Sequence, residues 1–67
     1  METYTAVARR EGEEWVAEVD NPPHCGRAVS RGHSRTEVQD MVTELVAILA
    51  GHRNFTVTVR FEEESDG

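Results

Sequence analysis

One cysteine and three histidines are the residues of this chain best suited to nucleophilic or metal chemistry. Cys25 could act as a nucleophile if His24 or His33 served as its base. Nothing in the sequence orients such a base, and adjacent side chains such as His24 and Cys25 rarely face each other. Free cysteine commonly packs as a small apolar residue, so we interpret Cys25 as a structural residue of a turn at the sheet edge.

A metal site built from Cys25 and the three histidines would need a recognisable ligand spacing. No pair among His24, Cys25, His33 and His52 has the spacing of a zinc knuckle, or the i, i+4 spacing of two ligands on one helix. We therefore expect the histidines to be solvated loop residues and predict no metal site.

Carboxylates and glycines do not form a catalytic pattern either. Glu11, Glu13 and Glu14 fall in one polar loop, where a solvated charge run is the usual outcome. The glycines of the later segments lack the spacing of a phosphate-binding loop, and the chain has no lysine to reach a phosphate; they are Gly26, Gly32 and Gly51. The sequence thus predicts no catalytic residue, no cofactor and no enzymatic activity.

Three arginines lie four residues apart, at Arg27, Arg31 and Arg35. They cross a strand, a turn and a helix start, so they need not form one patch. We expect them to support solubility and local ion pairs, although a guanidinium also suits a partner that carries carboxylates.

Length and charge limit the possible functions. The chain has 67 residues and a formal net charge of −6, with seven arginines, no lysine and thirteen acidic residues. Phosphate binding needs clustered cations, so direct nucleic-acid binding is disfavoured and a basic partner is favoured. No apolar run approaches the roughly 18–20 residues that span a bilayer, and residues 1–4 lack the character of a secretory signal. We expect a cytoplasmic protein without a membrane partner.

The small size also predicts self-association. A chain of this length buries only about 60% of the surface that its unfolded form exposes, and a single cysteine excludes an intrachain disulfide. We expect a homodimer or a higher homo-oligomer. Its interface would use a sheet edge or the face around Tyr4, Ala6 and Ala8.

Four segments have the composition and periodicity of strands. Residues 4–10 are rich in β-branched and aromatic side chains, and residues 15–20 alternate with Trp15, Ala17 and Val19 on one face. Residues 27–31 predict a short third strand, and residues 55–61 alternate throughout. The face opposite the apolar one is expected to be polar.

One segment has the pattern of an amphipathic helix. Ser34 and Glu37 have the spacing of a capping box, in which the Glu37 side chain reaches back to the Ser34 N–H. Gly51 is placed to end the helix. The apolar stripe comprises Val38, Met41, Val42, Leu45, Val46, Ile48 and Leu49.

The element order is therefore β-β-β-α-β, which predicts a two-layer α+β domain with one helix covering an antiparallel meander and a final strand joining the sheet. We expect one domain over residues 1–62 and an acidic flexible tail over residues 63–67.

This order of features resembles the HicB-like antitoxin family over roughly residues 4–50. A strand, a loop with glycine and an aromatic residue at Trp15 are followed by PPHC at residues 22–25, where the family typically has Pro-x-x-Gly-Cys or a near variant. A short strand then ends at Gly32, and Ser34 and Glu37 precede the helix. His24 stands where the family usually has glycine, His33 where Asp or Asn is common, and Val38 where alanine is usual.

The resemblance implies a partial ribonuclease-H-like or double-stranded-RNA-binding-like sheet, with the fourth strand beside the first and without catalytic carboxylates. It further implies a non-catalytic module that masks a small basic mRNA-cleaving toxin of the HicA type. Many members continue into a DNA-binding segment, for which 67 residues leave no room. The alternative is an interaction domain of the same fold without a toxin partner; a small enzyme that uses Cys25 is disfavoured.

Overall fold

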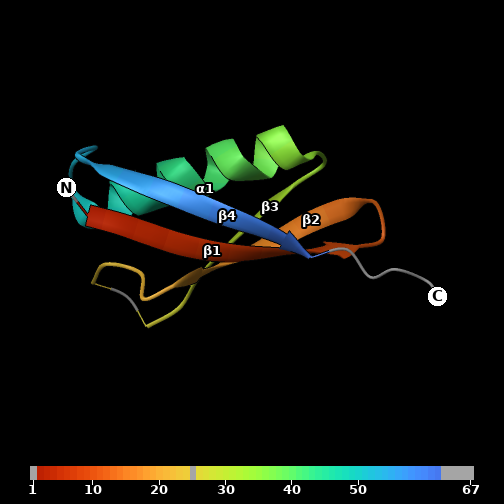
Figure 1. Ribbon diagram of the computed structural model, residues 1–67, viewed down its shortest axis with the longest axis horizontal. Helices are drawn as coiled ribbons and strands as arrows, with labels where there is room; N and C mark the ends of the chain where they lie inside the picture. Colours follow the sequence, from red (N-terminus) through yellow and green to blue (C-terminus); the bar gives the residue numbers. More distant parts are fainter. Residues whose placement is uncertain (1, 25, 63–67) are drawn as a thin grey trace.

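Four strands and one helix make up the protein, and the computed structural model describes residues 2–24 and 26–62. The elements are β1 (Glu2–Glu11), β2 (Glu14–Asp20), β3 (Ala28–Gly32), α1 (Arg35–Ala50) and β4 (Phe55–Glu62). The helix lies along one face of the sheet, so the molecule has two layers (Figure 1). The predicted β-β-β-α-β order and the α+β class are confirmed.

The sheet has the strand order β3-β2-β1-β4. β1, β2 and β3 form the predicted antiparallel meander. β4 lies beside β1, as the resemblance implied, and runs parallel to it over the whole length of β4. The sheet is therefore mixed. α1 returns the chain to the end of the sheet where β1 begins, so β4 starts there and runs in the same direction as β1.

The core lies between the helix and the inner face of the sheet. From the helix, Val38, Val42 and Val46 are completely buried. They pack on small and aromatic side chains of the meander, namely Ala6, Ala8, Trp15, Ala17, Val19 and Ala28. Because most of these sheet residues are alanines, the helix backbone comes close to the strands.

Fewer apolar side chains of the helix are buried than its sequence pattern predicts. Met41 is 49% exposed and Ile48 is 75% exposed, and Leu45 is only partly buried. The prediction that Met41 and Ile48 face the sheet is wrong, because the stripe is centred on Val42 and these two residues point to its flank.

One of the two predicted self-association surfaces is also wrong. Ala6 and Ala8 have no solvent exposure, because their side chains point toward the helix and belong to the core. Tyr4 packs against the same core. The face around these residues is thus the inner face of the sheet, which the helix covers.

Both ends of the helix follow the predicted signals, with one difference. The Ser34 hydroxyl accepts from the Glu37 N–H at 3.1 Å, and Gly51 takes the left-handed conformation at φ 78° and donates to the Ala47 carbonyl. The Glu37 carboxylate accepts from the His33 N–H at 3.2 Å, one residue before the predicted Ser34 N–H.

Aromatic contacts hold β4 at its two ends. Tyr4 and Phe55 meet edge to face with ring centroids 5.7 Å apart, where β4 begins. Trp15 and Phe61 meet in the same manner at 5.2 Å, near its end. Such pairs add to the stabilisation from buried area, so they fix the position of an edge strand that has only one neighbouring strand.

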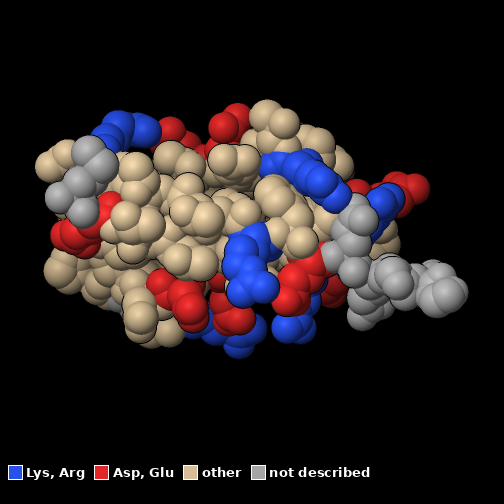
Figure 2. All heavy atoms as spheres, in the orientation of Figure 1, with Lys and Arg blue, Asp and Glu red and all other residues tan. Residues whose placement is uncertain are grey.

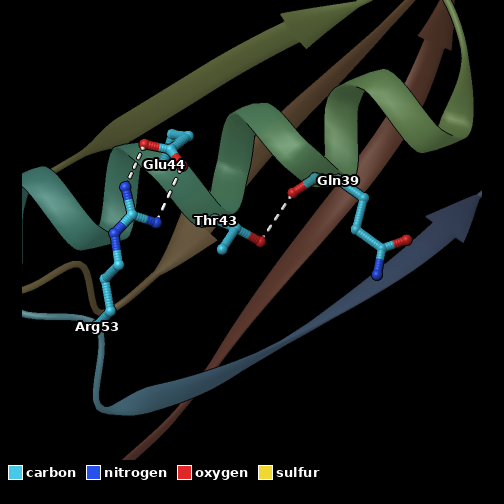
Figure 3. Close-up of polar contacts among 4 residues, drawn as sticks. All are labelled: Gln39, Thr43, Glu44 and Arg53. Atoms are coloured by element: carbon cyan, nitrogen blue, oxygen red, sulfur yellow. Dashed lines mark hydrogen bonds and ion pairs between the residues drawn. The ribbon is translucent and has the colours of Figure 1, made fainter.

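A bidentate ion pair joins the segment between α1 and β4 to the helix. The Arg53 guanidinium donates to both Glu44 carboxylate oxygens, at 3.0 and 2.8 Å (Figure 3). On the same helix the Thr43 hydroxyl donates back to the Gln39 carbonyl at 2.9 Å. No basic residue lies in the last helical turn, and Arg53 follows the helix three residues after its end.

Gly32 of β3 lies close against the backbone of the helix. A Cβ atom there would lie 2.6 Å from the Val38 nitrogen and 2.9 Å from its Cα, and a helix backbone cannot easily move aside. We expect Gly32→Ala to lower the free energy of unfolding by about 1–3 kcal/mol, measured by urea denaturation. Gly26→Ala is the control, since nothing lies within 4 Å of that position. Equal stability of the two variants would contradict the packing described.

The Glu44–Arg53 pair gives a prediction on the acid side. The hydrogen bonds from Arg53, and then its charge, lower the pKa of Glu44. The stabilisation by Glu44 is therefore present above its unfolded-state pKa and is lost as the pH falls through the lower folded-state pKa. In Arg53→Gln we expect the Glu44 pKa, followed by NMR, to rise to its ordinary range. Arg9→Gln should leave it in place; an unchanged Glu44 pKa in Arg53→Gln would contradict the pairing.

Candidate functional site

The three histidines lie in three separate connections. His24 lies in the loop between β2 and β3 and His52 in the segment between α1 and β4, whereas His33 lies at the opposite end of β3. His33 Nε2 is 3.8 Å from a Glu14 carboxylate oxygen, and His52 Nδ1 accepts from the Asn54 N–H at 3.0 Å. Neither of these contacts joins one histidine to another.

The predicted role of Cys25 as a turn residue lies outside the described residues. Across residues 2–24 and 26–62, no three His, Cys, Asp or Glu side chains come together in a group that could hold a metal ion. The same part of the chain has no helix long and apolar enough to pass through a membrane.

The three spaced arginines have different surroundings in the structure. Arg27 pairs with Glu18 at 2.7 Å. Arg31 lies on the outer face of β3, and Arg35 places its guanidinium 5.3 Å from the Trp15 ring centre and 5.4 Å from that of Phe61. Arg35 therefore lies over two aromatic rings at the edge of the core.

The outer face of the sheet, which the helix leaves bare, carries a shallow depression of about 360 Å³. Three valines line it, one from each strand of the meander: Val7, Val16 and Val29. Val29 is 41% exposed, and the other two are partly exposed. We call this surface the valine depression.

Charged side chains surround the valines of the depression. Four carboxylates and two guanidiniums line it, which leaves an excess of two negative charges; they are Glu11, Glu18, Asp20, Glu62, Arg9 and Arg27. Two of the carboxylates have ion-pair partners within the rim, Glu62 with Arg9 at 3.2 Å and Glu18 with Arg27. The acidic excess therefore rests on Glu11 and Asp20.

The sequence pattern did not predict this surface, because the outer face was expected to be polar. Val7, Val16 and Val29 occupy outward positions of their strands, opposite in phase to the buried residues. The register places Val7 and Val29 on either side of Glu18 in one row across the sheet. The sequence does show valines at outward positions of three strands. Whether these valines lie side by side depends on the register of the strands, which the pattern does not give.

The loop before β3 contains two non-glycine residues in the left-handed region. Asn21 has φ 52° and His24 has φ 57°. Asparagine adopts this conformation readily in turns, whereas histidine does so less often. His24 occupies the position at which the resemblance implied glycine, the residue that takes this backbone conformation without steric cost.

Comparison of the chain with protein-family models, with curated proteins and with solved structures gave no match.

The left-handed backbone at His24 can be tested by substitution. His24→Gly relieves the steric cost but makes the unfolded chain more flexible, so we expect the free energy of unfolding to stay equal or rise by up to about 1 kcal/mol. His24→Val should lower it by about 1–2 kcal/mol, because a β-branched residue is poorly tolerated there. Equal urea denaturation curves for the two variants would contradict the assigned backbone conformation.

Proposed function

We propose that this chain is a non-catalytic binding module of the HicB-like antitoxin type, which masks a small basic mRNA-cleaving protein by direct contact. The valine depression on the outer sheet face is the contact surface in this proposal. Because such a partner acts on mRNA, the proposed role places the complex in the cytoplasm and requires no direct nucleic-acid contact by this chain.

The valine depression is the observation that carries the proposal. An apolar floor within a charged rim suits the long side chains of arginine and lysine, whose stems pack on apolar surface while their heads stay at the polar edge. Here the valines would contact the stems, and Glu11 and Asp20 lie at the rim to receive the cationic heads. A basic protein surface is therefore the chemical class that fits.

Net charge supports the same partner at longer range. At −6, the chain attracts a cationic protein and speeds its encounter, and it repels acidic proteins and nucleic acids. Charge alone gives no orientation, however. The rim and floor of the depression supply the orientation by placing apolar and acidic groups at fixed positions on a rigid sheet.

Two features of the backbone are in agreement with the resemblance. β4 lies beside β1, and His24 has a positive φ where the family usually has glycine. These features concern the fold and the loop before β3. They support the family proposal without identifying the partner.

The test is a binding experiment with the protein encoded by the neighbouring gene, produced together with this chain and separately. The proposal requires that protein to be small and basic. We expect a stable complex that suppresses the partner's cleavage of RNA. Glu18→Arg, which reverses a charge in the depression, should raise the Kd about tenfold or more at low salt. Asp40→Arg is the control, because it makes the same change in net charge on the exposed side of the helix.

Each outcome has a definite meaning. Failure of the unmodified chain to bind the basic protein would refute the antitoxin role, and stable capture of a different, non-toxin protein would favour the interaction-domain alternative. Equal weakening by Glu18→Arg and Asp40→Arg would show that net charge, not the valine depression, determines the binding.

A further inference from the structure

β4 forms one edge of the sheet and has few of the usual devices that protect an edge, with Arg60 as its one basic residue. It pairs only with β1, and its eight residues alternate regularly, without proline or lysine. On the outer face, the Arg9–Glu62 ion pair and a 3.0 Å hydrogen bond between the Thr3 and Thr56 hydroxyls join β4 to β1. A long, regular edge of this kind is a template for another strand.

The inner side chains of β4 are only partly covered by the helix. Phe55, Val57, Val59 and Phe61 are all half-buried, whereas the inward residues of β3 are buried. Figure 2 shows this side of the molecule, where uncharged atoms form a band over β4 and the adjoining flank of the helix that basic side chains interrupt. The β4 edge thus combines backbone groups that point away from β1 with a row of half-buried apolar side chains on the inner face.

We propose that two copies of the chain pair through their β4 edges, antiparallel and about a two-fold axis, with Thr58 opposite Thr58. This inference does not depend on the proposed toxin partner. It commits the free edge to one occupant, which is the same strand of a second molecule.

The sequence of β4 is complementary to itself in this register. Val57 lies opposite Val59 and Phe55 opposite Phe61, so the partly exposed inner row is matched along its whole length. On the outer face Arg60 lies opposite Thr56, so no like charges oppose each other across the axis. A shift that placed Arg60 against Arg60 would bring two cations together and would be unfavourable.

Backbone geometry permits the same register. Residues that oppose each other are either both odd or both even, so inner side chains meet inner side chains. The backbone groups of each β4 that point away from β1 then meet their equivalents on the second copy. The interface is isologous, as the closed symmetry of a dimer requires.

The other edge of the sheet fits a second copy less well. β3 has only five residues, and its inner side chains are already buried beneath the helix. Pairing there would add backbone hydrogen bonds but little apolar contact. The two edges differ because the helix covers β3 and leaves β4 partly open.

The paired molecule would have a continuous sheet of eight strands, four from each copy. A two-fold axis perpendicular to the sheet places both helices on one side and both outer faces on the other. Two valine depressions would then open toward the same side, separated by the paired edges.

The test uses the unmodified chain and charge variants in analytical ultracentrifugation. We expect the 7.5 kDa chain to sediment as a dimer at micromolar concentration. Thr58→Glu and Thr58→Arg each place like charges at the axis, and each should raise the dimer Kd by roughly fivefold. A mixture of the two in equal amounts should recover the Kd of the unmodified chain or a lower value, because Glu then opposes Arg.

Two controls define the edge and the register. Val29→Glu adds the same charge near the β3 edge and should leave the dimer Kd unchanged. Thr56→Glu places a carboxylate opposite Arg60 and should not weaken the dimer. All four variants change exposed positions, and circular dichroism checks that each is folded.

The proposal is overturned by a monomeric unmodified chain, or by a dimer that Val29→Glu weakens and the Thr58 variants do not. If Thr58→Glu strengthened the dimer and Thr56→Glu weakened it, the stated register would be wrong. None of these measurements includes the basic partner, so failure here is separate from failure of the proposed antitoxin role.

Discussion

A single helix has to cover a sheet of four strands, and this mismatch of widths determines much of the structure. An α-helix with its side chains is about 10–12 Å across, whereas four strands spaced about 4.8 Å apart form a wider layer. The helix therefore covers one part of the sheet well and another part poorly. It approaches β3 so closely that Gly32 has no room for a side chain beside Val38, and it leaves the inner row of β4 half-buried.

Small residues make the close side of this arrangement possible. Four alanines lie on the inner surface of the meander, and they let Val38, Val42 and Val46 reach full burial; they are Ala6, Ala8, Ala17 and Ala28. The alanines also limit the apolar area that the core removes from water, since each alanine side chain is small. A domain of this size thus has a small core and two partly apolar surfaces outside it, the β4 edge and the valine depression. Covering either surface by a protein would add burial that the isolated chain lacks.

The local signals of the sequence predict the strands and the helix, but they do not predict which side chains of different elements come into contact. The alternation of residues 55–61 and the Ser34 and Gly51 caps placed β4 and the helix within a residue of their observed limits. Apolar periodicity cannot say how much of a helical stripe a sheet will cover, so Met41 and Ile48 were assigned to the interior. It also cannot show that Val7 and Val29 meet around Glu18, because that depends on the register of three strands. The position of β4 beside β1 came from the family resemblance and not from any pattern within β4.

The two proposed contact surfaces use different parts of the same strands, and this separation follows from the pleat. Inward side chains of β4 pack toward the helix, outward ones join the charged face, and the backbone edge lies between the two rows. Glu62 extends from β4 to the rim of the valine depression through its pair with Arg9, whereas Thr58 lies at the proposed two-fold axis. A second copy at the edge would therefore extend the outer face rather than cover it. Binding of a basic protein and pairing of two chains are geometrically compatible, and a partner with two suitably spaced basic surfaces would bind the pair with the advantage of effective concentration.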